Sequence, residues 1–124
     1  MITGGNATVY VSDMDRAVTF YTETLGLTLQ QRWGNHWAAI QAGPSLAIGL
    51  HPRSDKAPAP GTRGAISIGL SIDEPIEEAV RRLTAAGVRF RGPVVQDEKA
   101  GIALAFFGDP DGNDLYLCQV TRAY

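Results

Sequence analysis

The sequence has little of three things that would commit it to a particular class of protein: cysteine, long hydrophobic runs and net charge. Its one cysteine, Cys118, excludes an internal disulfide and a cysteine-based zinc cluster. No apolar run approaches the roughly 20 residues that cross a bilayer as a helix, so we expect no membrane partner. The net charge of −2 would not gather nucleic acid, so we expect no nucleic-acid partner either.

Signals for export and for common catalytic machinery are also missing. The N-terminal stretch lacks the basic region and apolar run of a signal peptide, so we expect a reduced, cytoplasmic setting. The sequence contains no G-x-S-x-G, no P-loop and no Rossmann fingerprint. What remains is a chain of 124 residues with 44% hydrophobic and 19% charged residues, typical of a globular domain with one core.

The first half of the chain predicts a strand, a helix and three further strands. Residues 6–12 alternate and are rich in β-branched and aromatic types, which favours a strand. Ser12 and Asp13 offer caps for the helix that follows, and Gly26 offers its C-terminal stop. The three further strands are expected over residues 27–32, 36–41 and 46–51.

The second half repeats this order after a Pro-rich connector. A strand is expected over residues 65–72, and Asp73-Glu74-Pro75 is expected to cap a helix that ends at Gly87. The two expected caps, like the two stop glycines, lie about 60 residues apart, which indicates a structural repeat. The last three strands are expected over residues 89–95, 103–107 and 115–120.

Two motifs carry a resemblance to a known family. The turn Phe107–Asn113 reads F-G-D-P-D-G-N between two alternating strands, and residues 11–27 read V-S-D-M-D-R-A-V-x-F-Y-x-x-x-L-G-L. Together they are similar to the vicinal oxygen chelate superfamily, which contains glyoxalases, bleomycin resistance proteins and extradiol dioxygenases.

The resemblance implies an α+β fold of two βαβββ modules that form a cup-shaped, partly open mixed β-barrel with the helices outside. One such domain would span residues 1–124, with module 1 at about 1–51, a linker at about 52–64 and module 2 at about 65–124. In that family two modules, commonly from two chains of a dimer, close around a ligand. We therefore expect a homodimer that binds a small molecule.

Metal-dependent members of this family hold a divalent ion with His, Glu or Gln on the cup strands. The matching positions here fall on Asn6, Ser67 and Tyr116, with a fourth within residues 47–51. Amide and hydroxyl oxygens are poor ligands for transition metals, which prefer imidazole, carboxylate or thiolate. We expect no metal and no cofactor.

Strand alternation predicts which side chains line the cup. The inward set is small, hydroxylated or aromatic, as a binding cavity requires, whereas the helix-facing set is aliphatic. In the bland alternative, the two tyrosines of the inward set simply fill the barrel. Trp33 and Trp37 flank a turn at the mouth of module 1 and offer stacking surfaces, although alternation leaves open whether Trp37 is instead a core residue beneath the helix. The ligand-binding residues expected are Asn6, Thr8, Tyr10, Trp33, Trp37, Gly49, His51, Ser67, Gly69, Tyr116 and Cys118.

The leading functional hypothesis is a metal-free protein that sequesters an antibiotic or similar aromatic natural product, as bleomycin resistance proteins do, without catalytic residues. The alternative is a metal-independent lyase, isomerase or hydrolase, for which His51 or His36 would be the base. A third possibility is a metalloenzyme with a rearranged ligand set that includes His51 and Cys118.

Overall fold

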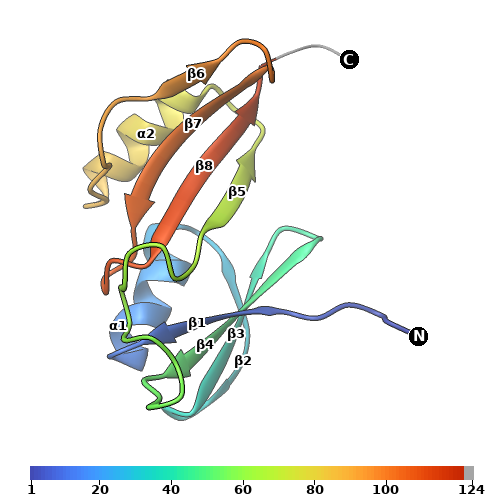
Figure 1. The fold of residues 1–124 in the computed structure, drawn as a ribbon, viewed down its shortest axis with the longest axis vertical. Helices are drawn as coiled ribbons and strands as arrows, with labels where there is room; N and C mark the ends of the chain where they lie inside the picture. Colours follow the sequence, from blue (N-terminus) through green and yellow to red (C-terminus); the bar gives the residue numbers. More distant parts are fainter. Residues whose placement is uncertain (122–124) are drawn as a thin grey trace. The chain divides into compact units, whose positions relative to one another are not determined.

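The computed structural model describes residues 1–121, and the chain divides into two compact units, Met1–Thr62 (unit 1) and Arg63–Tyr124 (unit 2). In each unit a strand, a helix and three more strands follow one another along the chain (Figure 1). Both units form a four-stranded mixed sheet in which the first strand runs parallel to the last. The predicted α+β class and the two βαβββ modules are confirmed.

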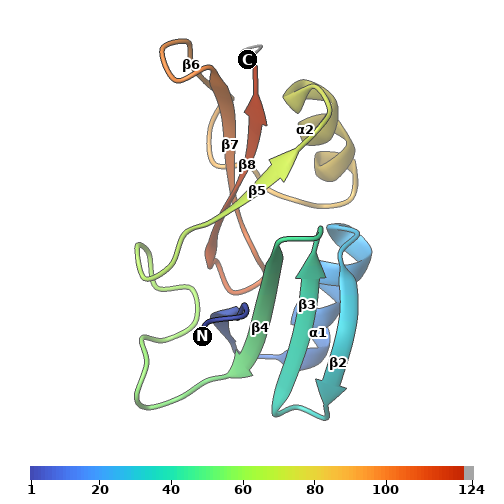
Figure 2. The ribbon, with the colours of Figure 1, turned by 90° about the vertical axis from the view of Figure 1, so that its right-hand side faces the viewer.

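Unit 1 has the strand order β1-β4-β3-β2. Figure 2 shows α1 behind the sheet, so the helix covers only one of its faces. The elements are β1 (Ala7–Val11), α1 (Met14–Thr19), the π-helical turn η1 (Phe20–Thr24), β2 (Thr28–Trp33), β3 (Trp37–Ala42) and β4 (Leu46–Pro52).

Alternation along the strands of unit 1 separates an aliphatic face from a mixed one. The aliphatic side chains pack toward α1 and are almost fully buried, while the residues between them are half-buried except for the buried Gly49. Burying aliphatic side chains in this way stabilises the unit by about 1.5–3 kcal/mol for each large residue. The buried strand residues are Val9, Val11, Ala38, Ile40, Ile48 and Leu50.

The first helix begins and ends at the residues that the sequence predicts. The Asp13 carboxylate accepts a hydrogen bond from the Arg16 backbone N–H at 3.0 Å, and Gly26 adopts a φ of 76° just beyond the helix. The last turn is π-helical, which the sequence does not predict, and its Leu25 N–H donates to the Phe20 carbonyl. Thr22 Oγ1 also donates to the Val18 carbonyl, a bond that bends helices.

Unit 2 has the matching strand order β5-β8-β7-β6. Its helix, α2, lies behind the sheet in Figure 1, again on one face only. No helix within residues 1–121 is long and apolar enough to cross a membrane. The elements are β5 (Ile68–Ile72), α2 (Ile76–Ala85), β6 (Val95–Asp97), β7 (Ile102–Gly108) and β8 (Asp114–Val120).

The strand predicted over residues 89–95 is wrong. Only Phe90 makes a bridge there, to Phe107, and β6 starts at Val95. Gly92 takes a left-handed φ of 95°, and Pro93 has no N–H to donate to a ladder. These two residues interrupt the strand that alternation alone suggests.

The second helix begins directly after the predicted segment Asp73-Glu74-Pro75, but the side-chain cap expected from that segment is absent. The N-cap residue of α2 is Pro75, whose side chain makes no capping hydrogen bond. Instead the Gln119 side-chain carbonyl, on β8, accepts from the Ile76 backbone N–H at 2.9 Å. A partner 43 residues away in the sequence satisfies the helix terminus, so local sequence could not have identified it.

The turn between β7 and β8 is held by the buried carboxylate of Asp109. One oxygen accepts from the backbone N–H groups of Asp111 and Asn113, at 3.0 and 2.9 Å. The other accepts from the Asn113 side-chain amide at 2.9 Å. The role predicted for Asp109 as a turn residue is confirmed, and the turn fixes the register in which β8 returns beside β7.

We predict that Asp109→Ala lowers the free energy of unfolding by about 2–4 kcal/mol, because it leaves buried N–H donors without an acceptor. Asp111→Ala, which keeps its backbone N–H in the turn, is the control and should cost less than half as much. Urea unfolding of both variants measures the difference. Equal losses would show that the Asp109 carboxylate does not hold the turn.

Candidate functional site

On the sheet face of unit 1 that lies opposite α1, three of the predicted ligand-binding side chains form a cluster. The Tyr10 and His51 rings meet edge to face with centroids 5.3 Å apart, and Trp37 and His51 with centroids 6.4 Å apart. The Trp37 indole lies directly over Gly49, where a Cβ atom would stand only 2.0 Å from the ring. Gly49 therefore makes room for the indole.

The hydrogen bond of His51 fixes its tautomer. Its Nδ1 atom lies 2.7 Å from the carbonyl oxygen of Pro52, which can only accept, so Nδ1 carries the proton and donates. In the neutral ring Nε2 then keeps its lone pair. The half-buried His51 is thus an acceptor or a base toward whatever approaches its other edge.

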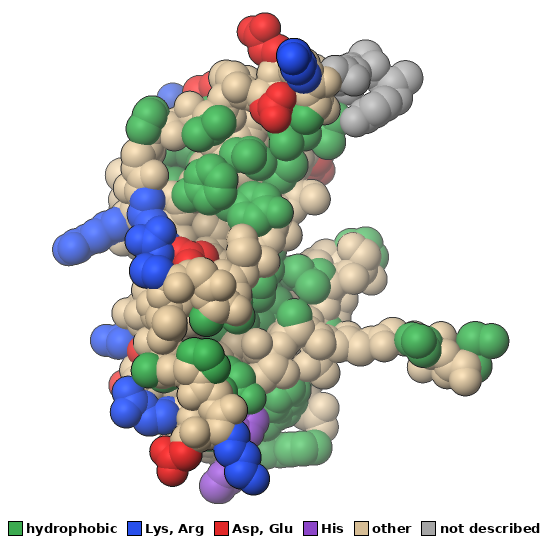
Figure 3. Space-filling view, viewed as in Figure 1, with side chains coloured by type: hydrophobic (Ala, Val, Ile, Leu, Met, Phe, Trp, Pro, Cys, Tyr) green, Lys and Arg blue, Asp and Glu red, His purple; other side chains and the backbone are tan. Residues whose placement is uncertain are grey.

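Unit 2 repeats this arrangement with different residues. The Tyr116 ring lies over Gly69, where a Cβ atom would be 2.4 Å from the ring. Phe106 packs beside Tyr116 with ring centroids 5.6 Å apart, and Cys118 lies two residues further along the same face. Figure 3 shows hydrophobic side chains gathered over this sheet, in the upper part of the view.

The remaining predicted residues lie at the edges of these faces. Asn6 and Ser67 are exposed, and each stands one residue before the first strand of its unit. Thr8 Oγ1 donates to Asn6 Oδ1 at 3.3 Å. Trp33 pairs with Trp37 at the hairpin end and is 60% exposed. Each unit therefore gathers its share of the predicted residues on or beside one sheet face.

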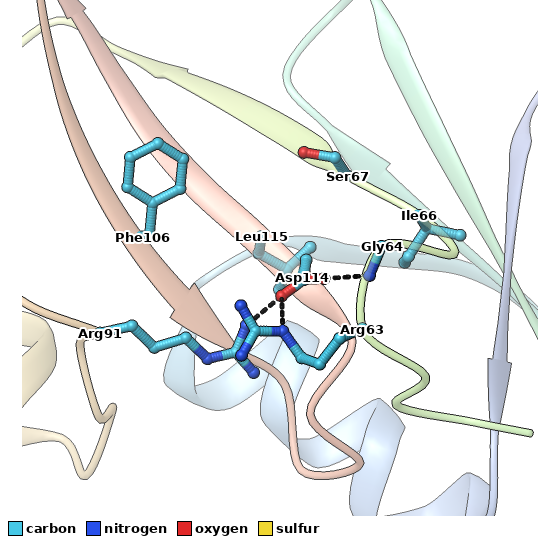
Figure 4. A pocket seen from close by; sticks show the side chains of 8 residues that line it. All are labelled: Arg63, Gly64, Ile66, Ser67, Arg91, Phe106, Asp114 and Leu115. Carbon is cyan, nitrogen blue, oxygen red and sulfur yellow. Dashed lines mark hydrogen bonds and ion pairs between the residues drawn. The ribbon is translucent and has the colours of Figure 1, made fainter.

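A cavity of about 430 Å³ opens in unit 2 where β5 and β8 begin (Figure 4). Its volume falls within the range of small-molecule sites. It combines an apolar wall with three charged side chains. The lining residues are Arg63, Gly64, Ile66, Ser67, Arg91, Phe106, Asp114 and Leu115.

Asp114 organises the charged side of this cavity. Its Oδ2 accepts from the Gly64 backbone N–H at 3.0 Å, Arg63 Nε lies 3.1 Å from Oδ1, and Arg91 donates to Oδ1 through Nη1. The Gly64 hydrogen bond, followed by the two guanidinium groups, holds the pKa of Asp114 below its ordinary value of 3.8. Asp114 is therefore a carboxylate at neutral pH.

Arg91 is the more firmly held of the two arginines. Its Nη2 donates to the Gly112 carbonyl at 3.0 Å, and its backbone N–H donates to the Phe106 carbonyl at 2.7 Å. The guanidinium also lies against Gly108, where a Cβ atom would be 2.4 Å from Nη2. The side chain is therefore fixed along the β7–β8 hairpin.

Of the residues that line the cavity, the sequence predicted only Ser67. Arg63 lies in the Pro-rich connector, Arg91 in a segment expected to be a strand, and Asp114 directly after the turn motif. No local pattern links three residues so far apart. Phe106 and Phe107 are neighbours on β7 and face opposite ways: Phe107 is buried, while Phe106 is 38% exposed.

The residues at the family's metal positions do not fit a transition metal. In unit 2 the metal position Tyr116 pairs with Gly69, two residues after the metal position Ser67. The equivalent pair in unit 1 is Thr8, two residues after Asn6, and Gly49, so the fourth position, which the sequence left within residues 47–51, falls on Gly49. The donor set would be a carboxamide, a hydroxyl, a phenol and no side chain at all. Within residues 1–121 no group of three or more His, Cys, Asp or Glu side chains is placed to hold a metal ion.

We predict that Gly69→Ala displaces the Tyr116 ring and lowers the free energy of unfolding by about 1–3 kcal/mol through overpacking. Gly69 has no left-handed φ, so the backbone itself accepts alanine. The matched test is Gly69→Ala in a Tyr116→Ala background, where the clash is gone and the loss should fall below about 0.5 kcal/mol. Chemical denaturation of the four proteins measures the coupling, and additive effects would show that the ring does not rest on Gly69.

The lowered pKa of Asp114 gives a signed pH dependence. A carboxyl group whose pKa is lower in the folded than in the unfolded protein stabilises the fold above its unfolded pKa, and this contribution is lost as the pH falls through the folded pKa. The stability difference between the wild type and Asp114→Asn should thus be constant above about pH 5 and shrink below it. Urea titrations across the acid range measure it, and a difference that does not shrink would contradict the assignment.

The chain is similar to the profile of one protein superfamily and to individual proteins. Residues 5–117 match the profile of the Glyoxalase/Bleomycin resistance protein/Dioxygenase superfamily. Glutathione transferase FosA of Serratia marcescens is 32% identical over an alignment of 118 positions, gaps included, and the alignment covers 89% of this chain and 75% of that protein.

Two solved structures from Streptomyces sp. CB03234 are also similar. TnmS3, an antibiotic binding protein, superposes with a TM-score of 0.78 at 30% identity over 97% of both chains. A glyoxalase/bleomycin resistance protein superposes with a TM-score of 0.71 at 32% identity, covering 91% of this chain and 98% of the other. The chain therefore belongs to the Glyoxalase/Bleomycin resistance protein/Dioxygenase superfamily.

Proposed function

We propose that this protein binds an aromatic small molecule of the antibiotic class on the aromatic faces of its sheets and releases it unchanged. The observation that carries the proposal is the pairing of rings with glycines on the sheet face opposite each helix. Trp37 lies over Gly49, and Tyr116 lies over Gly69. A flat aromatic surface of this kind suits stacking with a flat ligand.

Polar groups beside these rings can orient a ligand. His51 Nε2 is an acceptor next to Trp37 and Tyr10, and Asn6 and Ser67 carry hydrogen-bonding side chains at the edges of the two faces. Small-molecule sites commonly combine a mainly apolar lining with a few such groups. TnmS3 is an antibiotic binding protein that is 30% identical to this chain, and this similarity supports an antibiotic as the ligand class. As in the family, we propose that two copies of the chain form a dimer.

A second candidate function is catalysis without a metal ion. The relationship to a glutathione transferase favours enzymatic activity in general. The tautomer of His51, whose Nε2 keeps its lone pair, offers the general base that a reaction without a metal ion requires. The reaction would be a lyase, isomerase or hydrolase step on a small metabolite. Loss of turnover in His51→Ala with binding intact would distinguish this function from sequestration.

The direct experiment is incubation with a panel of aromatic antibiotics, with and without glutathione, followed by mass spectrometry of the retained and released compounds. Sequestration predicts retention of one unchanged molecule per subunit. A retained or released compound of altered mass would show catalysis and refute sequestration. Retention of nothing from the panel would count against the antibiotic class.

We predict that Trp37→Ala weakens binding of the retained compound by at least about tenfold, since it removes the stacking surface over Gly49. Trp33→Ala removes an equal indole from an exposed position and is the matched control, with a smaller effect expected. Because the chain has two tryptophans, Trp33→Phe leaves Trp37 as a single fluorescent reporter for the titration. Unchanged affinity in Trp37→Ala would remove this side chain from the site.

A further inference from the structure

The cavity of unit 2 carries an excess of positive charge. Two guanidinium groups, of Arg63 and Arg91, face one carboxylate, that of Asp114, and among residues 1–121 no other charged side chain lines the cavity (Figure 4). Both arginines stay protonated in proteins, and the lowered pKa of Asp114 keeps it ionised. The cavity therefore holds a net charge of about +1 at neutral pH.

The Asp114 carboxylate already accepts from three groups, whereas the Arg63 guanidinium has N–H groups that bind nothing else in residues 1–121. Asp114 is engaged by Gly64 and by both guanidinium groups. Arg91 uses both of its terminal nitrogens, for Asp114 and for the Gly112 carbonyl. Arg63 contacts Asp114 through Nε, and its terminal nitrogens make no hydrogen bond or ion pair within residues 1–121. These terminal N–H groups match the two oxygens of a carboxylate or a similar oxyanion.

The other wall of the cavity is apolar. Phe106 is 38% exposed and packs against Tyr116, while Leu115 is buried beneath and Ile66 is half-buried. A ligand that stacks on Phe106 can therefore extend toward the arginine pair (Figure 4). Ser67 offers one more hydrogen-bonding group on the same lining.

We propose that this cavity selects small molecules that carry one acidic group, a carboxylate or sulfonate, on an aromatic body. Arg63 binds the acidic group with its terminal nitrogens, Asp114 holds the Arg63 side chain in place, and Phe106 stacks on the aromatic part. A cation would be repelled by the two guanidinium groups, and a neutral ligand would form no ion pair with Arg63, whose 73% exposed side chain would stay hydrated. The proposal rests on the proposed function, because it names the class of aromatic ligand that unit 2 takes.

The test compares 1-naphthoate with its neutral counterpart 1-naphthamide, by calorimetry on the full chain at low and high salt. The wild type should bind the acid at least about fivefold more tightly than the amide. The ratio of the two dissociation constants should fall at high salt, because salt screens the attraction between the acid and Arg63. Arg63→Gln should remove this preference. Arg63→Lys keeps the positive charge but lacks the paired N–H groups of the guanidinium, so it should retain part of the preference. Arg89→Gln, an exposed arginine of the same unit that does not line the cavity, is the matched control and should bind as the wild type does.

Each result has one interpretation. Equal binding of acid and amide overturns the acidic-ligand proposal and leaves the aromatic-ligand function standing. Equal losses in Arg63→Gln and Arg89→Gln overturn a specific arginine site in favour of a general field effect. If neither probe binds while a panel antibiotic does, the cavity proposal fails alone. If no aromatic compound binds at all, both proposals fail. Thermal melts establish that every variant is folded.

Discussion

Within residues 1–121 each sheet packs against one helix of its own unit, and the rest of the unit depends on that one-sided packing. Side chains alternate along a strand, so the residues toward the helix must be aliphatic and close-packed. Val9, Leu50 and Leu117 show this on the helix side, with at most a few per cent of their surface exposed. The opposite face is free of that demand, and there the chain places rings, hydroxyls and glycines instead.

On this opposite face both units place an aromatic ring over a glycine, but at different positions in the sheet. In unit 1 the glycine lies on the last strand, at Gly49, and the ring comes from Trp37 on β3. In unit 2 the glycine lies on the first strand, at Gly69, and the ring comes from Tyr116 on the last. A ring resting on bare backbone gives a flat surface that no Cβ atom interrupts. The structural repeat is therefore also a repeat of surface chemistry, although the residues that produce it differ.

Much of the fold is predictable from the sequence because its signals are local. Alternation predicted β7 and β8, Asp13 predicted the start of α1, and the D-P-D-G-N run predicted the turn that Asp109 holds. The failures are non-local or steric. Gln119 caps α2 from another element, and Gly92 with Pro93 breaks a strand that composition favours.

The candidate site also has a part that local sequence signals predict and a part that they do not. The two faces of a sheet follow from period-two alternation, so the sequence could place Tyr10 and His51 on the ligand side. Alternation did not settle the side on which Trp37 lies, and the structure places its ring over Gly49 on that same face. The arginine pair is different, since Arg63, Arg91 and Asp114 meet only after the connector, the helix and the hairpin are in place. Long-range ion pairs leave no spacing pattern in a single sequence. They were found only from the folded arrangement.

In the function proposed for this protein, the ligand binds the sheet face opposite each helix. The most direct measurement is a side-chain NMR titration with a compound that the protein retains. Ligand binding should shift the ring signals of Trp37 and Tyr116. It should not shift the methyl signals of Ile48 and Leu117, which alternate with that face and pack in the core. Shifts that ignore this alternation, or that appear only on α1 and α2, would contradict this proposal.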